Sequence, residues 1–230
     1  MANLSLVALI KKWQNYMDKI LKDIVLYDYF RSSASYRVRI ALNLKGIEAK
    51  QIAINLKPGE DAQHSEQYKA INPQGRVPYF CDGDFHLGQS PAILEYLEEN
   101  YPEPALLPAN SQAKAYVRQL AAIIGCDVHP LNNLSVLKYL KTEFNADEAA
   151  ISKWYSTWIT GGFEAFEVFL VNNHSNGQFC FGDGVTLADL YLVPQVYNAR
   201  RFNVDLSPYP TIQSIEAHCL TLEAFRQAAP

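Results

Sequence analysis

Residues 24–46 read IVLYDYFRSSASYRVRIALNLKG, and this stretch of the 230-residue chain decides the fold. Its first four residues form a short β-prone run, which predicts a strand. Ser32 to Ser35 then offer hydroxyl side chains that cap helices, and apolar residues follow at helical spacing. Lys45-Gly46 is a typical helix end. The stretch therefore predicts a strand, a tight corner and a helix in direct succession.

The segments that follow extend this unit into a small α/β domain. The expected elements are a second strand at residues 47–54, a polar helix at 62–70, a hairpin of residues 77–81 and 84–87 around an Asp82-Gly83 turn, and a helix that Gln89 or Ser90 opens. A strand, a helix and a strand in succession give two parallel strands with a right-handed connection. The order β-α-β-α-β-β-α predicts an α/β sandwich of the thioredoxin kind.

The part of the chain after Pro108 has helical periodicity. Candidate helices lie near residues 111–139, 146–172, 186–200 and 211–228. We therefore predict a thioredoxin-like domain at residues 24–104, followed by an all-α helical domain at residues 105–230. Residues 1–23 are predicted to form an amphipathic N-terminal extension outside both domains.

Local features of the all-α part constrain its packing. Gly125 and Pro130 predict a kink in the first long helix, and Gly161-Gly162 predicts close packing or a cleft wall along the second. Thr186 and Asp189 have the spacing of a capping box, which predicts a cap that stabilises the fold and carries no chemistry.

The composition excludes several classes of protein. Apolar residues make up 49 % of the chain and charged residues 19 %, which supplies packed cores and excludes global disorder. A formal charge of −4 offers no basic stripe for nucleic acid, and no apolar run approaches the ~18 residues that span a bilayer. The four cysteines lie far apart without metal-ligand spacing, which predicts no metal site and a reducing, cytoplasmic compartment.

Ser32 and Ser35 lie three residues apart at the first strand-to-helix corner, where a dithiol redox protein of this fold carries two cysteines. Dithiol chemistry is therefore excluded. A hydroxyl, free backbone N–H groups and the positive end of a helix would together stabilise an anion such as a ligand thiolate. The alternative is a serine that only caps the helix.

Two further segments suit a peptide ligand. A cis bond at Val77-Pro78, just before a strand, would leave the Val77 backbone open to an extended peptide, and the alternative is a trans proline at the start of an edge strand. Gln89-Ser90 at a helix start would bind a carboxylate through hydroxyl, amide and backbone N–H groups, or would serve as an ordinary cap.

The serine-rich run from Ser32 to Leu42 resembles the signature of zeta-class glutathione transferases, the family that includes maleylacetoacetate isomerase. The likeness extends from residue 24 to the C-terminus, and the matching segments are residues 72–78, 89–93, 130–137, 189–196, 198–202 and 204–211. The serine signature and the Asn-Leu-Ser segment at 133–135 are the specific motifs, because Val-Pro and Gln-Ser are shared by glutathione transferases generally. Ala34 departs from the pattern, since many zeta members have cysteine there.

The resemblance implies a glutathione site with Ser32 and Ser33 as its catalytic residues. The Ser32 hydroxyl would face the glutathione sulfur. The Val77 backbone would pair with the cysteinyl unit, and Gln89 and Ser90 would hold the γ-glutamyl end. The further contacts that the resemblance implies are Ala34, Ser35, Tyr36, Arg37, Gln63, His129, Asn133, Leu134 and Ser135. A histidine before a helix proline, as at His129, is alternatively structural.

The resemblance also implies an activity, the glutathione-dependent cis–trans isomerisation of maleylacetoacetate to fumarylacetoacetate in tyrosine and phenylalanine catabolism. Because this substrate is a diacid, Arg31 and Arg201 are candidate clamps for its carboxylates. The alternative for each is a solvated or ion-paired arginine. Like its relatives, the chain is expected to form a homodimer.

Three other functions stay open. One is a maleylpyruvate isomerase, although Leu134-Ser135 lack the arginines expected for that shorter diacid. Another is a broad glutathione transferase or a glutathione-dependent dehalogenase. The last is a non-catalytic interaction module, against which the intact set of Ser32, Val77-Pro78 and Gln89-Ser90 argues.

Overall fold

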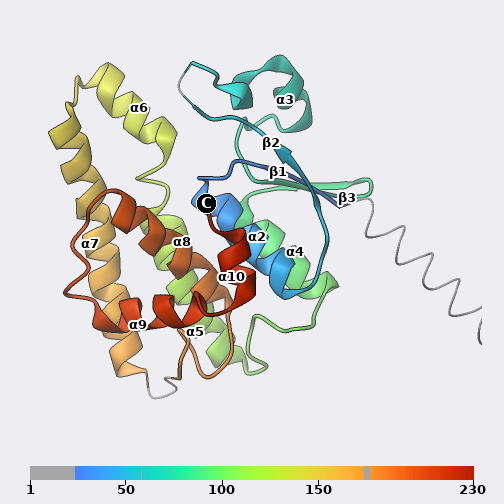
Figure 1. Cartoon of the computed structure of the whole chain (residues 1–230), viewed down its shortest axis with the longest axis vertical. Coiled ribbons are helices and arrows are strands. Elements are labelled where there is room, and N and C mark those ends of the chain that lie inside the picture. Colours follow the sequence, from blue (N-terminus) through green and yellow to red (C-terminus); the bar gives the residue numbers. More distant parts are fainter. Residues whose placement is uncertain (1–23, 58, 174–176) are drawn as a thin grey trace, which may run out of the picture. The chain divides into compact units, whose positions relative to one another are not determined.

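The computed structural model describes residues 24–57, 59–173 and 177–230, so the predicted extension at residues 1–23 lies outside the described part. The chain divides into two compact units. The first runs to Leu97 and also includes Ala228–Pro230, and the second is Glu98–Gln227. Unit 1 contains the sheet, whereas unit 2 is helical (Figure 1).

Unit 1 is built on a four-stranded mixed sheet. Its strands are β1 (Ile24–Asp28), β2 (Lys50–Ala53), β3 (Tyr79–Asp82) and β4 (Phe85–Gly88). They lie in the order β2-β1-β3-β4, with β1 parallel to β2 and the other pairs antiparallel. The predicted parallel pairing of the first two strands is confirmed, and so is the thioredoxin-like order of elements.

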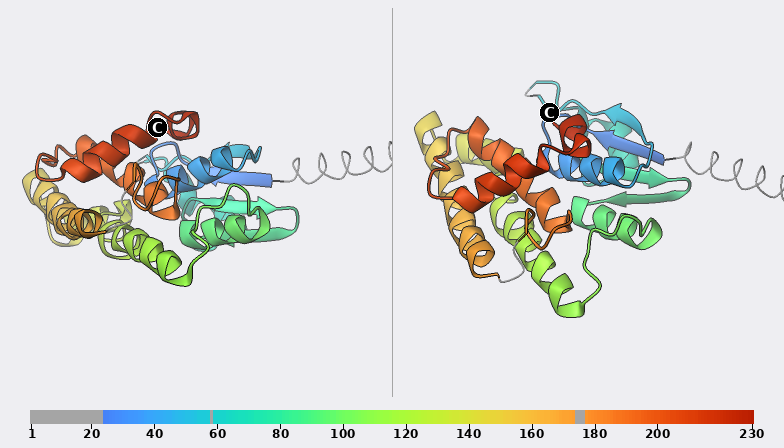
Figure 2. Two further views of the ribbon diagram at one scale, coloured as in Figure 1. Left: turned by 90° about the horizontal axis from the view of Figure 1, so that it is seen from below. Right: turned by 60° about the horizontal axis from the view of Figure 1, so that its bottom comes forward.

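Helices cover both faces of this sheet. They are α2 (Ser33–Leu44), the short 3-10 helix η1 (Ala62–His64), α3 (Glu66–Ile71) and α4 (Ser90–Asn100). Helices α2 and α4 lie on one side of the sheet and α3 lies on the other (Figures 1 and 2). The prediction of one continuous polar helix at 62–70 is wrong in one respect. Ser65 is extended and interrupts it, because the Ser65 hydroxyl accepts from the Tyr68 N–H and starts α3 anew.

The hairpin of β3 and β4 is confirmed, but its turn lies one residue later than predicted. Asp82 is still in the ladder, where it pairs with Phe85. The two linking residues are therefore Gly83 and Asp84. Gly83 has φ +55°, in the left-handed region where glycine has no Cβ penalty, and this places the glycine first in the turn.

Unit 2 contains shorter helices than the sequence pattern predicts. They are α5 (Ser111–Ala122), the π-helix η2 (Ile123–Val128), α6 (Leu134–Glu143), α7 (Glu148–Asn172), α8 (Leu187–Arg201), α9 (Pro210–Cys219) and α10 (Glu223–Ala228), whose last residue belongs to unit 1. The first predicted helix, at 111–139, is thus divided at the π-helix that contains Gly125. The last, at 211–228, is divided into α9 and α10.

Helix α8 is the centre of unit 2 and is almost entirely buried, packed against α5 and α9. The predicted capping box at its start is confirmed: the Asp189 carboxylate accepts from the Thr186 N–H at 2.7 Å and from the Thr186 hydroxyl at 2.9 Å. Gly125 lies against the Tyr191 ring without room for a Cβ, so η2 packs closely against α8 at the position of the predicted kink. Among the helices described, none combines the length and apolarity needed to cross a membrane.

Candidate active site

The strand register brings three predicted segments to one edge of the sheet. Tyr27 pairs with Tyr79 near the end of β1, so the Val77-Pro78 segment that precedes Tyr79 lies beside the corner that follows β1. Tyr79 also pairs with Gly88, the residue just before Gln89-Ser90. The corner, the X-Pro segment and the start of α4 therefore meet at the same place.

Ser32 occupies the corner as the N-cap of α2. Its hydroxyl oxygen accepts from the Ser35 N–H at 3.2 Å, and its own N–H donates to the Tyr29 carbonyl at 2.8 Å. In the described part of the chain no acceptor takes the Ser32 hydroxyl proton. The half-buried hydroxyl is thus held by its oxygen and keeps its proton for a ligand, at the positive end of a 12-residue helix.

Most of the serine signature after Ser32 is buried, and only Ala34 between Ser33 and Arg37 is half-buried. The side chains of Ser35, Tyr36 and Arg37 are 0 %, 2 % and 1 % exposed, and Ser33 is also buried. Arg37 Nη1 donates to the Ser90 hydroxyl at 3.3 Å, which joins the starts of α2 and α4. A buried cation therefore lies under the segment predicted to hold a carboxylate.

The Val77-Pro78 peptide bond is cis, so the predicted cis bond is confirmed and the alternative of a trans proline is excluded. The carbonyl of the preceding residue, Arg76, accepts from the Tyr68 hydroxyl and from Asn72 Nδ2, both at 2.7 Å. Within the residues described, neither the N–H nor the carbonyl of Val77 has a hydrogen-bond partner. The segment is thus held from behind while its Val77 backbone stays open to an extended ligand.

Gln63 lies on η1, next to the turn that leads into this segment. Gly75 has φ +61°, and a Cβ there would lie 2.8 Å from the Gln63 carbonyl oxygen, so only glycine allows this approach. Gln63 Oε1 is buried and lacks a hydrogen-bond partner among the described residues. On the other side, Gln89 Nε2 donates to Gln74 Oε1 at 2.7 Å, with Gln89 at φ +67°.

The other predicted contacts lie in unit 2. His129 follows the π-helix and is half-buried, with its N–H bonded to the Ile124 carbonyl at 2.9 Å. Asn133 caps α6, since its Oδ1 accepts from the Ser135 N–H and hydroxyl at 3.0 and 2.9 Å. Leu134 is 51 % exposed.

Arg201 and the Asn133 segment lie against the same part of α7. Asn132 Nδ2 donates to the Tyr155 carbonyl at 3.1 Å, and the Tyr155 ring stacks on Phe202 with 3.6 Å between centroids. The Arg201 guanidinium lies 5.0 Å from the Phe202 ring centre. The structure therefore brings the predicted clamp and the predicted glutathione segment of unit 2 together.

Arg31 in unit 1 and Arg201 in unit 2 are both exposed. No carboxylate in the described ranges pairs with either of them. Each lies over an aromatic ring, Arg31 at 5.1 Å from the Phe30 centre. Both cations are thus available to an anionic ligand.

Comparison with known proteins places this geometry in a family. Residues 26–105 match the model of the glutathione S-transferase N-terminal domain. Maleylpyruvate isomerase of Ralstonia sp. is 53 % identical over 89 % of this chain and 96 % of its own length. Maleylacetoacetate isomerase of Rattus norvegicus is 48 % identical over 90 % and 92 %, respectively.

Comparison with solved structures points to the same family as the sequence comparison. A holo structure of maleyl pyruvate isomerase, a bacterial glutathione S-transferase in zeta class, matches with a TM-score of 0.87 over 89 % of this chain and 96 % of its own, at 53 % identity. The chain belongs to the zeta-class glutathione transferases. The structure of maleylacetoacetate isomerase from Methylobacterium extorquens AM1, with bound malonate and glutathione, matches this zeta-class protein with a TM-score of 0.85 at 38 % identity, over 89 % of this chain and 99 % of that one.

The zeta-class corner of this protein contains no thiol of its own, since Ala34 stands in the serine signature. Cys81, Cys180 and Cys219 are buried, and burial raises the pKa of all three thiols. Cys126 is exposed, on the π-helix of unit 2. Among the described residues no group of three His, Cys, Asp or Glu could hold a metal ion. A reactive sulfur at the corner must therefore come from a ligand.

Sequence reasoning missed the residues that hold the zeta-class site from behind. Tyr68 and Asn72 fix the Arg76 carbonyl from α3 and its end, and both are buried. Trp154 on α7 donates its indole N–H to the Leu131 carbonyl at 2.9 Å. Among these residues, only Asn72 had a signal in the sequence, because it begins the 72–78 segment that matches the family.

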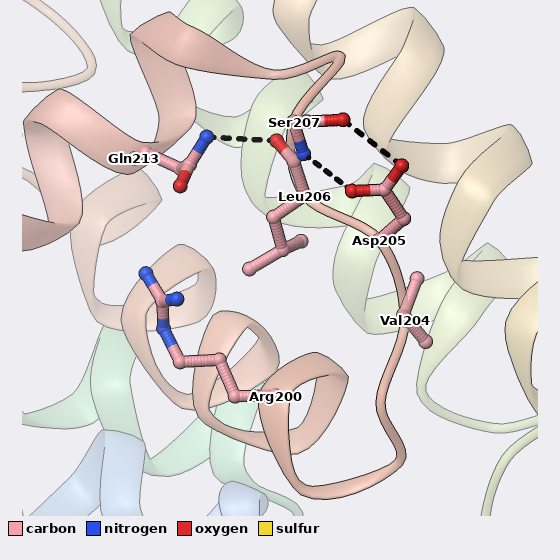
Figure 3. A pocket seen from close by; sticks show the side chains of 6 residues that line it. All are labelled: Arg200, Val204, Asp205, Leu206, Ser207 and Gln213. Carbon is pink, nitrogen blue, oxygen red and sulfur yellow. Dashed lines mark hydrogen bonds between the residues drawn. The ribbon is translucent and has the colours of Figure 1, made fainter.

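A separate hollow of about 660 Å³ lies at the α8–α9 link of unit 2, and Figure 3 shows its lining. Arg200 donates from Nε to the Glu216 carboxylate at 3.2 Å, and the Asp205 carboxylate accepts from the Ser207 N–H and hydroxyl. The Ser207 N–H and hydroxyl hold the pKa of Asp205 below its ordinary value. Each charged side chain in this hollow has an internal partner, and no predicted site residue lines it.

Proposed function

We propose that this zeta-class transferase is a glutathione-dependent cis–trans isomerase that converts maleylacetoacetate to fumarylacetoacetate. The observation that carries the proposal is the Ser32 hydroxyl, held at the start of α2 by the Ser35 N–H with its proton free for a sulfur. The open Val77 backbone and the unpartnered Gln63 Oε1 fit a peptide at the same edge of the sheet.

The hydrogen bond from Ser32, together with the α2 N-terminus, can stabilise a bound thiolate enough to activate it at neutral pH. A free thiol of pKa ~8.5 is only a few per cent ionised at neutral pH. Lowering that pKa by about two requires about 2.7 kcal/mol. A hydrogen bond from the Ser32 hydroxyl to an anion contributes about 1.5–3 kcal/mol. The α2 N-terminus adds about 0.3–1 kcal/mol, so the hydroxyl outweighs the helix dipole.

The other residues of the site would hold the tripeptide. The Val77 N–H and carbonyl would pair with its cysteinyl unit, as a strand pairs with a sheet edge. Ser90 and the N–H groups at the start of α4 would bind the γ-glutamyl carboxylate, with the Arg37 cation beneath them. Ser33, Ala34, Ser35 and Tyr36 would line the corner with their backbone, since Ser33, Ser35 and Tyr36 are buried. Gln63, Gln89, His129 and the Asn133-Leu134-Ser135 segment would complete the contacts.

When bound, glutathione supplies the thiolate that adds to and later leaves the double bond, so that this bond is single while it rotates. The chain itself orients the diacid. Arg31 and Arg201 would pair with its carboxylates, because both are exposed and unpaired with described carboxylates. The relative from Methylobacterium extorquens, solved with bound malonate and glutathione, supports a protein that binds a small diacid as well as the tripeptide.

A second substrate, maleylpyruvate, is favoured by one observation: the Ralstonia isomerase named for it is 53 % identical to this chain. The residues at Leu134-Ser135 argue against it, since neither supplies a cation for the shorter diacid. A broad transferase or dehalogenase would instead form stable conjugates or release halide. A non-catalytic module would not need the proton that Ser32 keeps.

The same proposal covers the organisation of the protein. Residues 24–104 would form the glutathione-binding domain and residues 105–230 the substrate domain, with residues 1–23 as an extension. We propose a homodimer, as in glutathione transferases generally. The four free cysteines support a cytoplasmic location, since they form no disulfide.

An isomerisation assay tests the proposal. Ultraviolet absorbance would follow maleylacetoacetate and maleylpyruvate separately, with glutathione, without it and with S-methylglutathione, whose sulfur is blocked. We expect turnover of maleylacetoacetate only in the presence of glutathione, and not without it or with S-methylglutathione. No glutathione should be consumed. Faster turnover of maleylpyruvate would assign the second function, and consumption of glutathione would assign a transferase. No turnover of either diacid would overturn the isomerase.

A further inference from the structure

The buried guanidinium of Arg39 joins three segments of unit 1. Its Nη1 donates to both carboxylate oxygens of Asp28 at 2.8 Å, at the end of β1. Its Nη2 donates to the Phe30 carbonyl at 3.0 Å. Its Nε donates to the Ala228 carbonyl at 2.8 Å, two residues before the C-terminus. Figure 1 shows the C-terminus beside the start of α2.

Each of these contacts is sheltered from water. Arg39 and Asp28 are each 6 % exposed, and Ala228 is 1 % exposed. Charge-assisted hydrogen bonds are strong where water is excluded, and a buried charge that loses its partner is costly. The guanidinium is planar and rigid, so the fixed directions of its Nε, Nη1 and Nη2 N–H groups set the relative positions of the three segments that accept from them.

The segment that Arg39 fixes is the one that carries Ser32. Phe30 lies two residues before Ser32, and the neighbouring Tyr29 carbonyl accepts from the Ser32 N–H. Asp28 is anchored in turn through its carbonyl, which accepts from the Ile54 N–H at 2.7 Å. The corner from Asp28 to Ser32 is therefore held by the strand, by Arg39 and by the turn itself.

We propose that Arg39 is a positioning residue for the Ser32 corner, and that the Ala228 carbonyl is a required part of its support. Arg39 touches neither the ligand nor the reacting atoms. It acts by setting the direction of the Phe30 carbonyl and hence the place of the Ser32 hydroxyl. The consequence for a bound thiol rests on the proposed function.

A pair of truncations isolates the Ala228 contact. A chain ending at Ala228 loses Ala229-Pro230 and keeps the Ala228 carbonyl oxygen within its terminal carboxylate. A chain ending at Gln227 loses that oxygen. With the longer truncation, we expect the pKa of the bound glutathione thiol, read from thiolate absorbance, to rise by about one, which is about tenfold less thiolate at neutral pH. The shorter truncation should match the full chain.

Arg39→Lys tests the guanidinium. Lysine keeps the charge for Asp28 but loses the fork that reaches Phe30 and Ala228. We expect a folded protein whose thiol pKa and KM for glutathione rise, with the diacid KM unchanged. An unchanged thiol pKa in both Arg39→Lys and the chain ending at Gln227 would overturn the proposal.

Amide hydrogen exchange separates this proposal from the proposed function, because it needs no glutathione. We expect faster exchange of the Ser32 and Tyr36 N–H groups in the chain ending at Gln227 than in the chain ending at Ala228. Equal exchange in the two chains would overturn the positioning role. If the full chain shows no bound thiolate at all, the proposed function fails, and the exchange result still decides the role of Arg39.

Discussion

Gly162 on α7 lies against Val128, the last residue of the π-helix, so closely that a Cβ at position 162 would be 2.3 Å from Val128 Cγ2. Val128 is 1 % exposed and directly precedes His129. Gly161, the residue before Gly162 on α7, is exposed, and a Cβ at position 161 would meet nothing within 4 Å. Two adjacent glycines of one helix therefore have opposite packing constraints.

This difference predicts opposite effects of alanine at the two positions. Gly162→Ala is expected to lower the free energy of unfolding by about 1–3 kcal/mol, because the buried Val128 side chain has to move. Gly161→Ala is expected to raise it by up to about 1 kcal/mol through helix propensity alone. Urea denaturation of both variants measures the two values. Equal effects would mean that η2 yields to the added methyl group.

Ser32→Ala is expected to raise the pKa of bound glutathione by about one to two, because it removes the hydrogen bond to the thiolate. It also removes the cap that accepts from the Ser35 N–H, at a cost of about 1 kcal/mol in unfolding free energy. Ser33→Ala is expected to have a smaller effect on the thiol. Thiolate absorbance against pH, with urea denaturation alongside, separates the two losses. A thiol pKa that Ser32→Ala leaves unchanged refutes the assignment.

Arg201→Ala is expected to raise the KM for the diacid about tenfold, because one charge-assisted contact to a carboxylate is lost. The KM for glutathione should stay the same. The neighbouring Arg200 is a matched control, since it is ion-paired with the buried Glu216. Arg200→Ala should lower the unfolding free energy by about 1–3 kcal/mol and leave the diacid KM unchanged. Steady-state kinetics that show equal KM values for both variants would discard the clamp.

Burial raises the pKa of the Tyr68 hydroxyl from its ordinary value of 10.0 to about 12. The neutral form is the one that donates to the Arg76 carbonyl. The folded state thus favours the protonated hydroxyl, and its contribution to stability is full below the ordinary pKa and is lost as the pH rises toward 12. Urea denaturation at about pH 9 and about pH 11 should show a steeper loss for the natural chain than for Tyr68→Phe. Parallel losses would contradict this.

The parts of the fold that were predicted correctly are those that neighbouring residues determine. The cap at Ser32, the hairpin and the capping box of Thr186 and Asp189 each depend on side chains within a few positions. The break at Ser65 was missed because the pattern of a nine-residue polar segment does not show whether its one serine bonds to the backbone and starts a new helix.

The site was predicted only in part, for the same reason. Residue types pointed to the corner, to Val77 and to Ser90, but the sequence allowed either isomer at Pro78. The support of the corner could not be predicted, because Arg39 and Ala228 lie 189 positions apart in the chain. No local pattern links two such positions, and an arginine on a helix usually faces solvent.

The buried Ala228 also matters for handling the protein. Only Ala229 and Pro230 separate it from the end of the chain, and both are exposed. An affinity tag or fusion partner attached after Pro230 would start two residues from Ala228, whose carbonyl accepts from Arg39 Nε. A bulky partner there would disturb this contact and with it the Ser32 corner. Protein for kinetic work is therefore better tagged at the other end.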